Sequence, residues 1–107
     1  MSHRFDIDQL RRDVSKGVRP LQITTHAQVE AFKDGLLLSD LRLVFETGEV
    51  IELYPDQNRA LIYAMLETES MPAHIVVEDT LNAGIIVTAY VPDRRKWSGN
   101  RHRRVNR

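Results

Sequence analysis

The chain has 107 residues, of which 42% are apolar and 28% are charged, and it contains no cysteine. This length and composition predict one folded domain that needs neither disulfides nor a structural metal. The lack of cysteine excludes thiol nucleophiles, thiolate metal sites and dithiol redox chemistry. The longest apolar run, residues 60–66, is far shorter than the about 20 residues of a transmembrane helix, and no segment resembles a secretory signal. We therefore expect a cytoplasmic protein with no membrane partner.

The net charge of zero is the sum of segments with opposite charge. Residues 25–92 carry three Lys/Arg and eleven Asp/Glu, a net charge of −8, whereas residues 93–107 carry seven and one, a net charge of +6. The C-terminal segment has almost no apolar residue besides Trp97, so burial cannot offset the entropy lost when it is ordered. We therefore predict that residues 98–107 form a mobile basic tail.

The N-terminal residues predict one short helix followed by a connection. Asp6 is a suitable N-cap, apolar residues follow at helical spacing, and Gly17 is a natural end. Residues 18–24 contain a proline and are typical of a connection. We assign residues 1–23 to an N-terminal helix and connection.

Two more helices are predicted next along the chain. Thr25 can cap a helix over residues 26–34, and a glycine follows that helix. Ser39 can cap a helix over residues 40–46, which is also followed by a glycine. Both segments carry enough apolar residues to pack against a sheet.

After residue 48 the hydrophobic period changes to two, which is typical of strands. The connections are short and rich in turn-forming residues, so successive strands are expected to pair as an antiparallel meander. The helices then cover one face of this sheet. The predicted fold is α+β, with two or three N-terminal helices packed on one face of a four-stranded antiparallel meander, and its main domain covers residues 24–97. The predicted strands are residues 50–54, 60–66, 73–78 and 84–91.

Strand alternation assigns the side chains of this sheet to two faces. The helix-facing set is predicted to be Ile51, Leu53, Ile75, Val77, Val87, Ala89 and Val91. The opposite face is predicted to carry Glu52, Tyr54, His74, Val76, Glu78, Ile86, Thr88 and Tyr90. Polar groups capable of chemistry therefore gather on one side of the sheet.

His74 is the leading candidate catalytic residue, because its predicted neighbours are Tyr54, Thr88 and Tyr90. An imidazole here could transfer protons near neutral pH while the hydroxyls orient a substrate or donate to a phosphate. The alternative is a histidine whose hydrogen bonds are satisfied by its neighbours on a partly solvated sheet.

His26 is a second candidate, since it lies in the first turn of a predicted helix. The positive end of the helix dipole disfavours the imidazolium form, which leaves a neutral ring able to act as a base or donor. The triosephosphate isomerase histidine is the known example of this effect. The alternative is that His26 only packs at the start of its helix.

The basic C-terminal segment is a candidate nucleic-acid site. Arg94 and Arg95 could contact phosphates while the indole of Trp97 stacks on a base. The alternatives are that the tail binds the acidic body of its own chain or of a neighbouring chain, or that it is solvated. Metal-binding and glycine-rich phosphate motifs are absent from the sequence, so we expect no metal and no cofactor.

Several of these residues form a pattern that resembles the bacterial family catalogued as domain of unknown function 4258. The resemblance covers about residues 24–97 and implies a small fold like that of RelE-type toxins, which cleave or bind RNA. It also implies a family signature at His26, His74, Thr88, Tyr90 and Trp97. The pattern consists of Thr-His-Ala at 25–27, Gly35, Asp40, Gly48 with residues 50–55, and then residues 72–77, residues 86–92 and Trp97.

The sequence departs from that family in its first helix, which usually has arginines four and eight residues after the histidine. This chain has Glu30 and Asp34 at those positions. Two anions in place of two cations weaken any phosphate binding by this helix.

Two functions of different classes remain open. The first is RNA binding or metal-independent ribonuclease activity, with His74 as general base or acid, Tyr90 as the second proton-transfer group and the tail arginines stabilising the charged transition state. The second is a non-catalytic protein-interaction module, whose partner is an antitoxin-like protein or a second copy of the chain, bound on the same face or on the last strand as an open edge. The sequence leaves open whether the protein is an enzyme.

Overall fold

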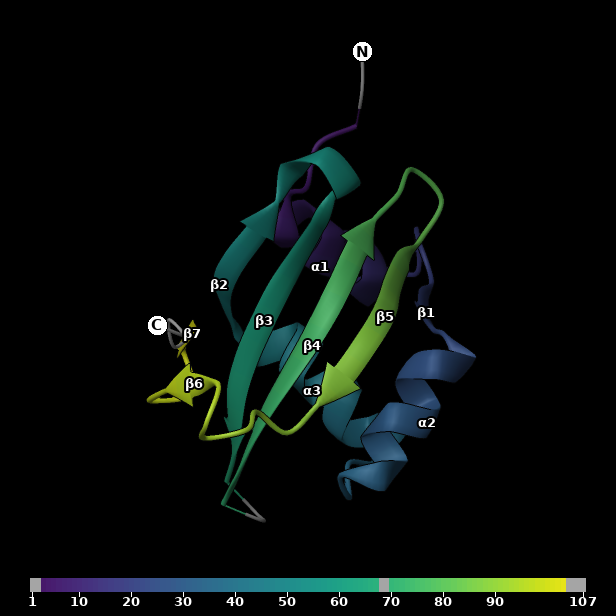
Figure 1. Ribbon diagram of the computed structural model, residues 1–107. Coiled ribbons are helices and arrows are strands. Elements are labelled where there is room, and N and C mark those ends of the chain that lie inside the picture. Colours follow the sequence, from purple (N-terminus) through teal and green to yellow (C-terminus); the bar gives the residue numbers. More distant parts are fainter. Residues whose placement is uncertain (1–2, 68–69, 104–107) are drawn as a thin grey trace.

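The computed structural model describes residues 3–67 and 70–103, and its elements are drawn in Figure 1. It confirms the α+β class, with three α-helices in the described residues, none long and apolar enough to cross a membrane. The helices are α1 (Ile7–Ser15), α2 (Thr25–Lys33), α3 (Leu38–Thr47) and the short 3-10 helix η1 (Pro55–Gln57). The strands are β1 (Leu21–Ile23), β2 (Glu49–Tyr54), β3 (Arg59–Leu66), β4 (Met71–Asp79), β5 (Gly84–Tyr90), β6 (Trp97–Ser98) and β7 (His102–Arg103).

The main sheet has the strand order β1-β5-β4-β3-β2 within the described residues. Strands β2 to β5 form the predicted antiparallel meander, but β1 adds a fifth strand that runs parallel to β5. The prediction of a four-stranded, purely antiparallel sheet is therefore wrong, since residues 18–24 contain a strand. Three residues are too few to show an alternating pattern, and β1 depends on backbone pairing with distant residues. Because β1 pairs with residues 84–86 of β5, this part of the last meander strand is not an open edge.

Two helices begin earlier than predicted, for reasons that lie in their hydrogen bonds. Thr24 is the N-cap of α2, and its hydroxyl oxygen accepts a hydrogen bond from the backbone N–H three residues later at 3.0 Å. At α3 the carboxylate of Asp40 accepts a hydrogen bond from the Leu37 N–H at 2.8 Å, so Ser39 is not the cap.

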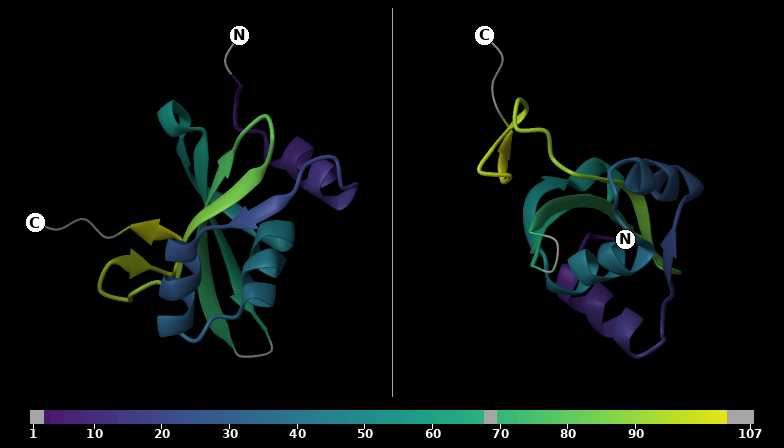
Figure 2. Two further views of the ribbon diagram at one scale, coloured as in Figure 1. Left: turned by 90° about the vertical axis from the view of Figure 1, so that its right-hand side faces the viewer. Right: turned by 90° about the horizontal axis from the view of Figure 1, so that it is seen from below.

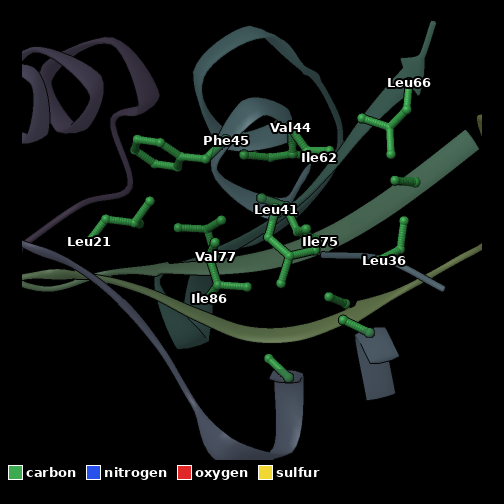
Figure 3. Packing of buried hydrophobic residues seen from close by; sticks show 14 of the residues in the cluster. Leu21, Leu36, Leu41, Val44, Phe45, Ile62, Leu66, Ile75, Val77 and Ile86 are labelled. Atoms are coloured by element: carbon green, nitrogen blue, oxygen red, sulfur yellow. The ribbon is translucent and has the colours of Figure 1, made fainter. Parts of the chain in front are cut away.

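The hydrophobic core lies between the sheet and the helices. Helices α1 and α3 lie on one side of the sheet and strands β6 and β7 on the other (Figure 2), while α2 packs against β5 through Ala27 and Ala31. Figure 3 shows side chains of α3 meeting those of the sheet. The labelled core residues are Leu21, Leu36, Leu41, Val44, Phe45, Ile62, Leu66, Ile75, Val77 and Ile86.

Two β-bulges change which residues reach this core. On β5, Ile86 pairs with Val77 and Thr88 with Val76, so one extra residue lies between them. Ile86 is consequently fully buried in the core, where alternation predicted Val87. A second bulge follows Val50, which packs against the core, whereas Leu53, also predicted to face the helices, is 60% exposed.

A buried ion pair ties the N-terminal segment to the end of β4. Arg19 Nη1 donates to Asp79 Oδ1 at 2.7 Å, and the Asp6 backbone N–H donates to Asp79 Oδ2 at 2.9 Å. Asp79 is 0% exposed and Arg19 is 6% exposed. A second carboxylate, that of Asp13, accepts from Arg19 Nε at 2.8 Å. This network fixes the position of α1 relative to the sheet.

Residues 97–103 form a small hairpin, in which β6 pairs with β7, on the sheet face opposite α1 and α3. Most of this hairpin falls in the segment that the sequence predicted to be a mobile tail. Residues 104–107, the remainder of that predicted tail, lie outside the described residues.

Candidate functional site

Three rings lie side by side on the sheet face opposite α1 and α3. The strand register places Tyr63 of β3 opposite His74 of β4, and His74 opposite Tyr90 of β5. The ring centroid of His74 is 5.9 Å from that of Tyr63 and 5.2 Å from that of Tyr90. His74 and Tyr90 thus share a face as alternation predicted. Tyr63 was not among the predicted site residues, although alternation within the apolar run of β3 could have indicated it.

The C-terminal hairpin covers this row of rings. The Trp97 indole meets the His74 ring edge-on, with centroids 4.5 Å apart, and the two residues are 3% and 0% exposed respectively. His74 Nε2 lies 2.6 Å from the carbonyl oxygen of Asn100. Since a carbonyl only accepts, Nε2 carries the proton, and Nδ1 can accept from the Tyr90 hydroxyl at 3.3 Å. Both ring nitrogens of His74 are therefore engaged within the protein.

Two arginines of the hairpin region pair with glutamates of β2. Arg101 Nε lies 2.9 Å from Glu49 Oε1, and Arg103 Nη2 lies 3.2 Å from Glu52 Oε1. The same guanidinium groups lie over aromatic rings, that of Arg101 over Tyr63 at 5.0 Å and that of Arg103 over Trp97 at 4.6 Å. These contacts agree with the alternative that the basic segment binds the acidic body of its own chain.

Glu52 also links the hairpin to Tyr54. The Tyr54 hydroxyl donates a hydrogen bond to Glu52, and burial together with this carboxylate raises the pKa of Tyr54 to about 12. Burial acts to raise the pKa of Glu52, but the hydrogen bonds from Tyr54 and Arg103 lower it below its ordinary value. Glu52 is thus a carboxylate, and Tyr54 a neutral phenol, at neutral pH.

An open pocket of about 320 Å³ lies beside the buried rings. Its aromatic wall is formed by Tyr90 and Trp97, and two cationic side chains, Lys96 and Arg103, also line it. The carboxylate of Asp93 lies at the same pocket but is paired with Arg95 at 2.9 Å. The pocket therefore combines aromatic edges with positive charge.

The other predicted site residues lie outside this cluster. His26 is exposed in the first turn of α2, and the described ring contacts and hydrogen bonds of His74 do not include it. Thr88 faces Val76, two positions along the ladder from the pair of His74 and Tyr90. Arg94 and Arg95 are exposed in the segment before β6. The structure therefore brings together His74, Tyr90 and Trp97, with Tyr54 joined to them through Glu52 and Arg103.

Burial makes the charged form of His74 unfavourable. Burial lowers the pKa of His74 from its ordinary value of 6.5. The hydrogen bond to the Asn100 carbonyl raises this pKa, but by less than burial lowers it. This group therefore contributes stability above pH 6.5 that is lost as the pH falls through the lower folded value. Urea unfolding at about pH 7.5 and at about pH 5.5 measures how much the free energy of unfolding falls between these two pH values. We expect this fall to be smaller for His74→Gln than for the wild type. The exposed His102→Gln is the control, and equal losses in all three proteins would contradict this prediction.

The negative charge on α2 has a structural partner. The carboxylate of Asp34, at the C-cap of α2, accepts a hydrogen bond from the Val91 N–H at 2.8 Å. An arginine at position 34 could not accept this bond. The departure from the arginine pattern therefore ties α2 to the end of β5 instead of providing a phosphate contact.

Comparison with known proteins identifies a family but no activity. The model of a family described as a domain of unknown function, DUF4258, matches residues 23–91. The match runs from the end of β1 to just past β5, so it includes His74 and Tyr90 but not α1 or the hairpin. Searches of curated proteins and of solved structures found no match. Since the matched residues make up more than half of the chain, the protein belongs to the DUF4258 family.

Proposed function

We propose that the protein binds single-stranded RNA at the pocket between the end of β5 and the C-terminal hairpin. The observation that carries this proposal is an open pocket lined by the Tyr90 ring and the cation of Lys96, beside the buried Trp97 ring and beside Arg103, which is paired with Glu52. Single-stranded nucleic acids are bound by such a combination of rings and cations, because cations neutralise phosphates while bases stack on aromatic side chains.

The charge distribution limits where an RNA strand can lie. Residues 25–92 carry a net charge of −8, so a polyanion is repelled by the body of the protein. The segment from residue 93 onward carries +6 and supplies both cations of the pocket. We therefore expect a short footprint on the hairpin and an affinity that falls steeply with salt.

The proposal includes the relationship to RelE-type toxins implied by the sequence. In support, the helices α2 and α3 come before a meander of strands, which is the order of elements that the resemblance implies, and the pocket lies at the last of these strands. Cleavage would follow the metal-independent route, in which the 2′-hydroxyl attacks the adjacent phosphate and the 5′-oxygen leaves. His74 would act as the general base or the general acid, and Tyr90 would be the second proton-transfer group. Both nitrogens of His74 are occupied while the hairpin covers it, so we propose binding and make cleavage an outcome of the test.

The protein-interaction alternative has less support. It depended on an uncovered sheet face or on β5 as an open edge, but the hairpin covers the ring cluster on that face and β1 pairs with β5. An antitoxin-like partner or a second copy would have to bind elsewhere or displace the hairpin.

The test is a binding titration with a fluorescein-labelled single-stranded RNA of about 12 nucleotides in excess EDTA. Fluorescence anisotropy of the labelled RNA measures the binding. Lys96→Ala should weaken binding about three- to tenfold, because a phosphate contact is lost. Binding by the wild type should fall steeply between about 50 and 200 mM salt. Arg42→Ala is the charge-matched control, since Arg42 is on α3, on the other side of the sheet, and its variant should bind like the wild type.

Two results would contradict the proposal. One is no change in anisotropy at low salt, and the other is an equal loss in the Lys96 and Arg42 variants, which would indicate attraction by net charge alone. The same samples report cleavage, since fragments ending in a 2′,3′-cyclic phosphate that disappear in His74→Ala would assign ribonuclease activity. Intact RNA in both proteins would limit the function to binding.

A further inference from the structure

We infer that the C-terminal hairpin is an autoinhibitory strap, in which Glu49 and Glu52 occupy the arginines that RNA phosphates would otherwise bind. The inference rests on the proposed function and adds a mechanism of regulation to the same site. In this mechanism RNA competes with the two carboxylates, lifts the hairpin and uncovers the row of rings beneath it.

Among the described residues, few contacts hold the hairpin on the sheet. Each of its two strands has two residues, and Trp97, the one hydrophobic residue of the hairpin, is buried. Beyond this indole, the hairpin contacts the sheet through the Asn100 carbonyl, through the pairs that Arg101 and Arg103 make with the two glutamates, and through the Arg101 guanidinium over the Tyr63 ring. A segment held by so few groups can open without unfolding the domain.

The ionic contacts of the hairpin are weak and exchangeable. The side chains of the Arg101 and Glu49 pair are 51% and 54% exposed, and in the other pair Arg103 is 57% and Glu52 25% exposed. Ion pairs at such positions are screened by salt and contribute little to stability. A guanidinium group binds carboxylate and phosphate oxygens through the same donors, so a phosphate can take the place of either glutamate.

The hairpin hides the row of rings on the sheet. Its removal would free His74 from the Asn100 carbonyl and from the Trp97 ring, leaving Tyr63, His74 and Tyr90 exposed on three neighbouring strands. Such a row offers flat faces to unstacked bases, and the released Trp97 adds another. The open form is thus the form with the larger RNA-binding surface.

The test uses Trp97, which is the only tryptophan of the chain, as an internal reporter without any RNA. In Glu49→Gln/Glu52→Gln the pairs with the arginines are lost, so we expect red-shifted emission and at least about a twofold rise in acrylamide quenching. Glu30→Gln/Glu46→Gln removes the same charge from α2 and α3 and should keep the wild-type emission. Added NaCl should raise quenching in the wild type as well, which tests the strap even if a variant folds poorly.

The RNA titration is then repeated with both double variants. If the strap competes with RNA, Glu49→Gln/Glu52→Gln should bind at least about threefold more tightly than Glu30→Gln/Glu46→Gln, because the competent fraction has risen. Unchanged Trp97 quenching in the variant and in salt, with RNA still bound, would overturn the strap and leave the proposed function standing. Released Trp97 with no RNA binding by any protein would overturn the proposed function and RNA as the competing ligand.

Discussion

Asp79→Ala is expected to lower the free energy of unfolding by about 3–5 kcal/mol, because it leaves a buried guanidinium without its main partner. The carboxylate of Asp79 is fully buried and accepts hydrogen bonds from Arg19 and from the backbone of Asp6. Arg19 retains the carboxylate of Asp13 and the carbonyl oxygen of Thr80 as partners. The alanine variant therefore loses the contact that joins the N-terminal segment to β4. Urea unfolding monitored by circular dichroism measures the change in the free energy of unfolding.

Matched variants distinguish the loss of a buried charge from a loss of volume. Asp13→Ala removes the more exposed partner of Arg19, so its effect should be clearly smaller. Asp79→Leu combined with Arg19→Met replaces both charges by apolar groups and should recover much of the stability lost in Asp79→Ala. A double variant as unstable as Asp79→Ala would contradict the explanation by an unpaired buried charge.

Much of the fold follows from local patterns in the sequence. Cap residues and glycines predicted all three helices to within two residues at their starts, and the change to period two predicted strands β2 to β5. Strand β1 could not be predicted in this way, because Leu21–Ile23 becomes a strand only by pairing with Gly84 to Ile86. The bulge on β5 could not be predicted for a similar reason, since the position of an extra residue depends on the pairing with β4 and not on the sequence of β5 alone.

The sequence predicted the pair of His74 and Tyr90 in the candidate site but not the contacts that the hairpin makes with the sheet. Alternation put His74 and Tyr90 on one face, and the register between β4 and β5 makes them neighbours. The contact of Asn100 with His74 and the pairing of Arg101 with Glu49 join residues far apart in the chain. Charge counting treats such arginines as solvated, so it predicts a tail where the structure has a hairpin.

Gly48→Ala is expected to destabilise the protein by about 1–3 kcal/mol through overpacking where α3 ends and β2 begins. A Cβ atom at this position would lie 2.5 Å from Ile62 Cγ2, 2.6 Å from the Val44 carbonyl oxygen and 2.8 Å from the Tyr63 carbonyl oxygen. Two of these atoms belong to the backbone of a helix and of a central strand, which cannot move away cheaply. Arg11 makes the cost larger, because its Nη2 donates to the Gly48 carbonyl oxygen at 2.7 Å and would lose this bond if the chain shifted.

Gly84→Ala is the matched control for this variant, since it adds the same methyl group at a strand end. The three atoms nearest to its Cβ would all belong to the side chain of Leu10, at 3.1–3.4 Å, so the overlap is smaller and can be relieved by a shift of a few tenths of an ångström in a side chain. Thermal unfolding should therefore show a clearly lower Tm for Gly48→Ala and a Tm close to the wild type for Gly84→Ala. Equal values for the two variants would contradict the steric argument, because both add one methyl group and only the first places it against backbone atoms.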